Sequence, residues 1–148
     1  MLRVYLDNCC YNRPYDDQRQ VKVALETIAI IMIQTLVRCE SIELTWSYVL
    51  DYENMKNKSV EHRETIQQWA SFAIADVDDS PNVRADAQCA QSTGLRTADA
   101  LHVACAIDAE CDYLITVDKR LLKYQDERIA VCDPLSFLRI LEDELNET

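Results

Sequence analysis

Apolar and polar positions along the chain predict strands and helices in alternation. Short apolar runs that end at polar residues predict strands over residues 3–6, 41–45, 113–117 and 128–133. Apolar residues at helical spacing predict helices over residues 18–38, 48–57, 60–75, 81–94, 98–109, 119–125 and 134–145. The polar segment before the first long helix, residues 12–17, contains Pro14 and is expected to be a loop.

Local signals mark several helix boundaries. Ser47 is expected to cap one helix, because a serine oxygen accepts a hydrogen bond from a free amide of the first turn. Ser80 followed by Pro81 predicts another helix start, since proline is favoured at the first helical position. Gly94, the single glycine of the chain, is expected to end that helix, and Thr97 to cap the next.

The order of these elements predicts an α/β fold. We expect a three-layer α/β/α sandwich with a central, mainly parallel sheet of four to five strands. The chain has 148 residues, which suits one domain spanning residues 1–148, and it has no internal repeat and no Gly/Ser-rich linker. A chain of this size buries enough surface for a core without disulfides.

Two aspartates stand out beside predicted core elements. Asp99 lies in the first turn of an otherwise apolar helix, and Asp118 directly follows the apolar strand 113–117. A carboxylate beside a dry core is costly unless it is paired or holds a metal ion. These two positions therefore need a functional or structural explanation.

Glu53 is a third carboxylate that faces the core. Trp46, Val49, Leu50 and Glu53 fall at positions i, i+3, i+4 and i+7, which share one helix face. Glu53 is therefore expected to point inward with the apolar residues.

Asp7 ends the first predicted strand, so four acidic residues can meet at one edge of the sheet. In parallel sheets, ligands bind beyond the carboxyl ends of the strands, where Asp7 and Asp118 are expected. Clustered carboxylates need a cation between them, and an all-oxygen set suits Mg²⁺ or Mn²⁺. The chemistry this predicts is metal-assisted phosphodiester hydrolysis, in which the ion polarises a phosphoryl oxygen and activates water.

Each acid also has a local explanation that the sequence leaves open. Asp99 can serve the helix dipole, Asp118 can cap the next helix, and Asp7 can form an Asx turn. Glu53 can pair with an arginine such as Arg96. One metal site has the advantage of explaining all four acids together.

Charge and composition limit the partners. The net charge of −11 argues against passive adhesion to nucleic acid or to an anionic membrane. No apolar run approaches the roughly 20 residues of a membrane span, and the first residues do not resemble a signal peptide, so we expect a cytoplasmic protein. The seven cysteines lack metal-ligand spacing and are expected to be free thiols, mostly in the core.

Four motifs together resemble the PIN-domain family, and more narrowly its VapC-type toxins. They are YLDN, SYVLDYEN, TADALHVACAI and LITVDKRL. The resemblance implies a PIN-like fold with Asp7, Glu53, Asp99 and Asp118 as ligands of the divalent ion, and with Asn8 and Thr116 as small polar residues beside the acids. It further implies cleavage of single-stranded RNA, a homodimer and an inhibitory antitoxin protein.

Other polar residues near these motifs have weaker signals. Arg13, Arg96, Lys119 and Arg120 are candidates for phosphate contacts, with ordinary surface charge as the alternative. His102, one turn after Asp99, is expected to be a hydrogen-bonded helix histidine, since a metal-activated water needs no histidine base.

Two other functions remain open. A haloacid-dehalogenase-type phosphohydrolase also begins with a strand that ends in aspartate, but it needs a second aspartate where this chain has Cys9. A non-catalytic PIN-like interaction module would keep the same acids, so only measurement separates it from a nuclease.

Overall fold

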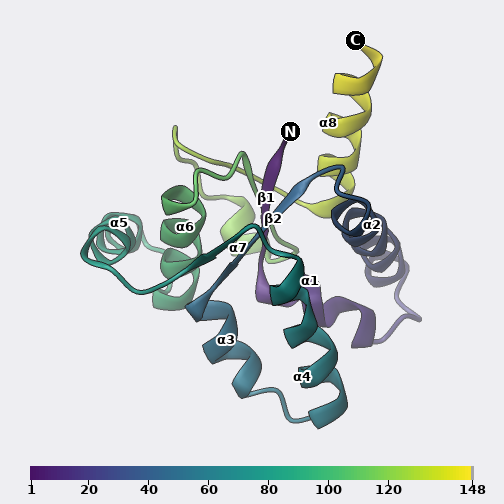
Figure 1. The fold of residues 1–148 in the computed structure, drawn as a ribbon, viewed down its shortest axis with the longest axis horizontal. Coiled ribbons are helices and arrows are strands. Elements are labelled where there is room, and N and C mark those ends of the chain that lie inside the picture. Colours follow the sequence, from purple (N-terminus) through teal and green to yellow (C-terminus); the bar gives the residue numbers. More distant parts are fainter. Residues whose placement is uncertain (148) are drawn as a thin grey trace.

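Five parallel strands form the centre of the computed structural model, which describes residues 1–147 (Figure 1). The strands are β1 (Arg3–Leu6), β2 (Glu43–Ser47), β3 (Ala75–Val77), β4 (Tyr113–Ile115) and β5 (Ala130–Cys132), in the spatial order β3-β2-β1-β4-β5. In the register of the sheet, Val4 lies opposite Leu44 of β2 and Tyr113 of β4. The predicted α/β fold with a parallel sheet is confirmed.

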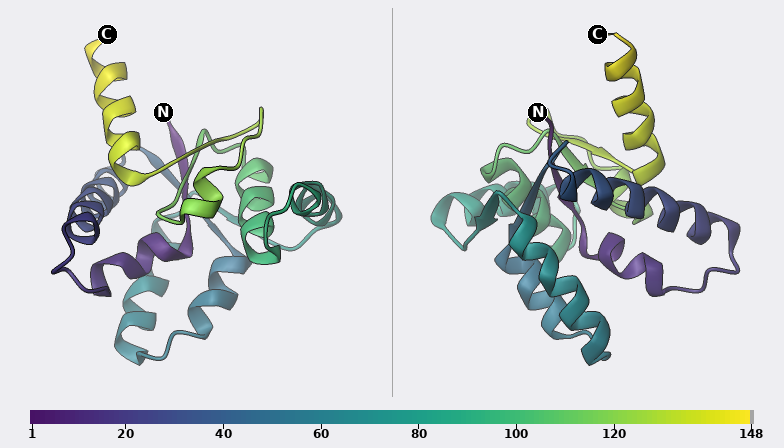
Figure 2. Two further views of the ribbon diagram at one scale, coloured as in Figure 1. Left: turned by 180° about the vertical axis from the view of Figure 1, so that it is seen from behind. Right: turned by 45° about the vertical axis from the view of Figure 1, so that its right-hand side comes forward.

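Helices cover both faces of this sheet. They are α1 (Asn8–Asn12), α2 (Val21–Arg38), α3 (Tyr48–Met55), α4 (Val60–Gln67), α5 (Pro81–Ser92), α6 (Thr97–Asp108), α7 (Lys119–Leu122) and α8 (Pro134–Asn146). Figure 1 shows α5 and α6 on one side of the sheet and α2 and α8 on the other. Helices α1, α3 and α4 gather beyond the carboxyl ends of β1 and β2, and α8 begins beside α2 (Figure 2).

The central strand β1 is dry on both faces. Val4, Tyr5 and Leu6 are fully buried, as expected for a strand covered by helices on both sides. Burying an apolar side chain of this size contributes roughly 1.5–3 kcal/mol to the free energy of unfolding, so burial of β1 stabilises the centre of the sheet. The polar residue that follows, Asp7, therefore has a rigid support.

Two segments differ in kind from the prediction, and the expected strands 41–45 and 113–117 differ in their bounds from β2 and β4. Residues 60–75 were expected to form one helix, but α4 ends at Gln67, a 3₁₀ helix spans Gln68–Phe72, and β3 follows. Strand β3 has three residues and is held by pairing with β2, which a local pattern cannot predict. The expected loop around Pro14 is instead α1 and a 3₁₀ helix, Arg13–Tyr15, because Asp7 accepts a hydrogen bond from Asn8 N and caps α1.

Most predicted boundary signals are confirmed. Ser47 Oγ accepts a hydrogen bond from Leu50 N and caps α3. Ser80, the residue before Pro81, caps α5 in the same way by accepting from Val83 N. Gly94 has φ +108°, which a side chain would disfavour. The prediction for Thr97 is wrong: it is the first residue of α6, and its hydroxyl accepts from Gln91 Nε2.

All seven cysteines are free thiols. Cys10, Cys105 and Cys111 are buried, while Cys39 and Cys89 are exposed, contrary to a core position for those two. Over residues 1–147, every helix is too short or too polar to cross a membrane.

Candidate active site

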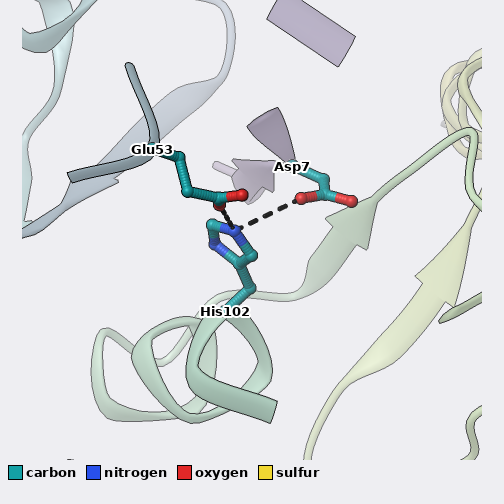
Figure 3. A group of neighbouring side chains, drawn as sticks. All are labelled: Asp7, Glu53 and His102. Carbon is teal, nitrogen blue, oxygen red and sulfur yellow. Dashed lines mark hydrogen bonds and ion pairs between the residues drawn. The ribbon is translucent and has the colours of Figure 1, made fainter. Parts of the chain in front are cut away.

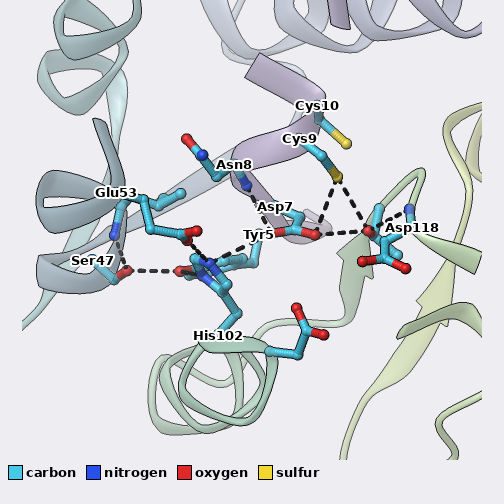
Figure 4. Close-up of polar contacts among 12 residues, drawn as sticks. Tyr5, Asp7, Asn8, Cys9, Cys10, Ser47, Glu53, His102 and Asp118 are labelled. Atoms are coloured by element: carbon cyan, nitrogen blue, oxygen red, sulfur yellow. Dashed lines mark hydrogen bonds and ion pairs between the residues drawn. The ribbon is translucent and has the colours of Figure 1, made fainter. Parts of the chain in front are cut away.

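The site begins where β1 and β4 end side by side. Asp7 N donates to the carbonyl of Ile115, the last residue of β4, at 2.9 Å. This pairing places Asp7 in contact with Thr116, and Asp118 lies two residues further along the chain. Figure 4 shows Asp7 and Asp118 at this edge of the sheet. The carboxyl ends of neighbouring parallel strands thus bring two of the predicted acids to one edge.

Thr116 connects these two acids. Its buried hydroxyl donates to Asp7 Oδ2 at 2.8 Å and accepts from Asp118 N at 3.1 Å. The Cys9 thiol also donates to Asp7 Oδ2, at 3.2 Å, while Asn8 N donates to Asp7 Oδ1 at 2.8 Å. Asp7 is therefore held as a buried carboxylate by donors from both neighbouring segments.

Glu53 and His102 approach Asp7 from two other elements (Figure 3). Glu53 comes from α3 and His102 from α6, and His102 Nε2 is in close contact with Glu53 Oε1. The same nitrogen lies 3.5 Å from Asp7 Oδ1. One ligand atom from each of these residues lies within 4.8 Å of the other two, a spacing that fits a single divalent ion.

The charge of His102 responds to this cluster. Burial lowers the pKa of His102, but the hydrogen bond with Glu53 and the negative charges of Asp7, Glu53 and Asp99 outweigh burial and leave the pKa raised. A positive group is thus favoured between the acids, as expected where carboxylates converge.

Asp99 and Asp118 form a second pair, joined by Arg96. Arg96 Nη2 lies 2.7 Å from Asp118 Oδ2 and 3.2 Å from Asp99 Oδ2. Burial and the charge of Asp7 raise the pKa of Asp99, although Arg96 opposes this shift. The charges of both aspartates raise the pKa of Arg96.

All four predicted acids line or border one cleft of about 410 Å³, together with Asn8, Arg13 and Arg96. Glu53 points inward, as predicted, but it contacts His102 instead of Arg96. Asp118 also caps α7 by accepting from Arg120 N at 2.8 Å, so that local explanation holds alongside its place in the cleft.

His102 is the residue whose place in the cluster the sequence did not reveal. It is hydrogen-bonded, as predicted, but its partners are Glu53 and Tyr5. Its position three residues after Asp99, on the same face of α6, is a signal that points to the cleft.

The candidate phosphate-binding residues are spread around the cleft. Arg13 pairs with Asp16 at 3.1 Å and lies 3.5 Å from the buried Glu26. Arg120 borders an adjoining cavity that also reaches Arg96, and Lys119 is exposed at the start of α7.

Comparison with known proteins agrees with this architecture. The model of the PIN domain matches residues 4–127, so the chain belongs to the PIN-domain family. No curated protein matches the sequence significantly.

Two solved complexes contain similar folds. The crystal structure of VapBC2 from Rickettsia felis, bound to a DNA fragment from the promoter, has a chain with TM-score 0.56 and 13% identity; the match covers 88% of this chain and 97% of that one. The DNA-bound VapBC structure from Salmonella typhimurium gives TM-score 0.54 and 14% identity, covering 90% and 99%. At these identities the likeness concerns the fold.

Proposed function

We propose that this protein is a divalent-metal-dependent endoribonuclease that hydrolyses phosphodiesters of single-stranded RNA. The observation that carries the proposal is the convergence of Asp7, Glu53, Asp99 and Asp118 on one cleft at the carboxyl edge of the sheet. A PIN fold with this acidic cluster supports a nuclease, and the function rests on the acids acting together.

The donor set of the cleft fits Mg²⁺ or Mn²⁺. Asp7 and Glu53 offer carboxylate oxygens within 4.8 Å of each other, and Asp99 is close enough for the charge of Asp7 to raise its pKa. A bound divalent ion would activate a water molecule and stabilise the charge on the phosphoryl oxygens. Asp7 and Glu53 would hold it directly, with Asp99 and Asp118 as direct or water-mediated ligands.

The remaining polar residues prepare this site. Thr116 and the amide of Asn8 donate to the two oxygens of Asp7, so that the carboxylate does not reorient when the divalent ion binds. Arg96 carries positive charge at the mouth of the cleft, where a phosphate of the substrate would enter. No nucleophilic side chain is required, because water is the attacking group.

A second cavity adjoins the acidic cleft, and its lining residues suit a nucleic-acid strand. It has about 550 Å³, shares Arg96 and Asp99 with the acidic cleft, and is lined by Arg120, Lys123 and Tyr124. Within residues 1–147, neither Arg120 nor Lys123 forms an ion pair, so both charges are available. Cations beside an aromatic ring suit the backbone and an unstacked base of a single strand.

We further propose that the protein is the toxin of a type II toxin–antitoxin pair, acts in the cytoplasm and forms a homodimer. The two similar structures described above are VapBC complexes, which supports an antitoxin partner. The exposed apolar residues Val21, Leu25, Ile28 and Met32 of α2 support a covered surface of the kind found in dimers. A short gene for an antitoxin next to the coding gene would support the pairing separately.

The decisive test is cleavage of labelled single-stranded RNA by the purified protein with Mn²⁺ or Mg²⁺. We expect metal-dependent cutting by the parent, no cutting in EDTA, and a loss of at least 100-fold in Asp99→Asn. Asp78→Asn, which changes an exposed acid outside the cleft, is the matched control.

Two outcomes would contradict the nuclease. Equal cutting by the parent and Asp99→Asn would assign the activity to a contaminant. Metal binding without cutting of varied RNAs would favour the non-catalytic interaction module.

A further inference from the structure

A chain of buried hydrogen bonds connects the N-cap residue of α3, through two other elements, to Glu53 on the same helix. Ser47 Oγ, the N-cap of α3, lies 2.7 Å from Tyr5 Oη, which lies 2.6 Å from His102 Nδ1. His102 Nε2 contacts Oε1 of Glu53, which α3 carries (Figure 4). The chain therefore connects α3, β1 and α6 and returns to α3.

The direction of these hydrogen bonds follows from the groups involved. An ionised carboxylate only accepts, so Nε2 of His102 must donate to Glu53. In the neutral ring Nδ1 then accepts from the Tyr5 hydroxyl, which burial keeps protonated by raising its pKa. Tyr5 in turn accepts from Ser47, whose oxygen still accepts from Leu50 N.

Protonation of His102 would not change its contact with Glu53. In the charged ring Nδ1 donates to Tyr5, and the two hydroxyl groups turn around, but Nε2 still donates to the carboxylate. The orientation of Glu53 is thus independent of the charge on the ring.

Glu53 needs such support more than the other acids do. Its side chain is 27% exposed and has three rotatable bonds, whereas Asp7 is short, buried and fixed at both oxygens. Among residues 1–147, His102 is the only group that hydrogen-bonds the Glu53 carboxylate, and Oε2 has no partner. Oε1 is therefore held, whereas Oε2 has no competing hydrogen bond among the described residues, and Glu53 lines the cleft.

We propose that His102 is a positioning residue: the Ser47–Tyr5–His102 chain holds Glu53 Oε1 so that Oε2 can bind the divalent ion. This inference rests on the proposed function, because Glu53 is taken as a ligand of that ion. Supporting residues of this kind typically affect metal affinity by 10–100-fold.

Tyr5→Phe tests the hydrogen-bond chain, because it removes only the Tyr5 hydroxyl oxygen. We expect it to weaken Mn²⁺ binding, measured by isothermal titration calorimetry, by about 3- to 10-fold. Tyr11→Phe is the matched control, because the hydroxyl of the buried Tyr11 has no hydrogen-bond partner among the described residues. Tyr11→Phe should leave Mn²⁺ affinity unchanged, and thermal melting of both variants shows whether they fold.

Substitution of His102 itself supplies the second test. His102→Leu removes the donor and is expected to weaken Mn²⁺ binding by about tenfold or more. His102→Gln, whose amide nitrogen can take the place of Nε2, should recover part of the affinity. Equal affinity in both variants and in the parent would reduce His102 to a packing residue.

Spectroscopy separates positioning from direct ligation. Long-range ¹H–¹⁵N spectra of the metal-free protein should show a proton on Nε2 of His102. Electron spin echo spectra of the Mn²⁺ complex should show no histidine nitrogen coupling. A proton on Nδ1 alone, or a nitrogen coupling that His102→Leu abolishes, would overturn the proposal.

The two proposals fail in different ways. If the parent binds Mn²⁺ and cuts RNA while Tyr5→Phe and His102→Leu bind the ion equally well, only the positioning role is wrong. If the parent binds no divalent ion, the proposed nuclease and the positioning role are both wrong.

Discussion

Arg96 Nη2 lies 2.7 Å from Oδ2 of Asp118, and the same nitrogen reaches Asp99 at 3.2 Å. A guanidinium thus neutralises two of the four cleft acids, while His102 lies between the other two. The acidic site is therefore divided into two pairs, each with its own cationic or hydrogen-bonding partner. An incoming divalent ion would have to compete with Arg96 for Asp99 and Asp118.

Arg96→Gln should therefore strengthen metal binding. Because it removes a competing cation from a half-exposed ion pair, we expect Mn²⁺ affinity to rise roughly fivefold. The KM for RNA should rise at the same time through the loss of a phosphate contact. Arg84→Gln, which breaks an exposed pair with Asp79, is the calorimetric control. An unchanged or weaker Mn²⁺ affinity in Arg96→Gln would refute the competition.

Thr116→Val should damage both the site and the fold. The isosteric change leaves Asp7 Oδ2 without its 2.8 Å donor and Asp118 N without its acceptor. We expect the free energy of unfolding to fall by about 1–3 kcal/mol and Mn²⁺ affinity to fall about tenfold. Thr116→Ser keeps the hydroxyl and should retain both properties. A loss in Thr116→Ser with none in Thr116→Val would assign the role of Thr116 to packing of its methyl group instead.

Arg120 and Lys123 should contribute to RNA affinity through charge alone. In an Asp99→Asn background that prevents cutting, the double variant Arg120→Gln/Lys123→Gln should bind single-stranded RNA more weakly. The slope of log Kd against log salt should fall by roughly 1.4, the value for two phosphate contacts. Lys22→Gln/Arg139→Gln removes two exposed charges from α2 and α8 and should leave the slope unchanged. Fluorescence anisotropy across a salt series measures both.

Asp126 should make stability depend on acid pH. Hydrogen bonds from Arg128 outweigh burial and lower the pKa of Asp126 to about 2, below its value in an unfolded chain. The stabilisation is therefore present at neutral pH and is lost as the pH falls from about 4 towards about 2. Asp126→Asn should melt at a lower temperature than the parent at pH 7, and the difference should shrink through that window. Glu127→Gln, an exposed neighbour, should show no such trend.

Much of the candidate site was predictable because its signals are local. Asp7 directly follows β1 and Asp118 lies three residues after β4, and parallel strands present their carboxyl ends at one edge of the sheet. Glu53 faces inward as expected, although Trp46, which the spacing placed on the same helix face, lies in β2. Glu53 still faces inward because Val49, Leu50 and Glu53 lie in the same helix at helical spacing.

Sequence by itself determined the α/β class, the central strand, most caps and the acids that border the cleft. Burial, strand ends and capping depend on residues within a few positions of one another, so their patterns are visible along the chain. Tertiary structure alone decided that β3 pairs with β2, that Arg96 joins Asp99 to Asp118, and that His102 joins Asp7, Glu53 and Tyr5. These contacts connect segments up to about a hundred residues apart, and only the packing of α3 and α6 at the end of the sheet brings their side chains within bonding distance.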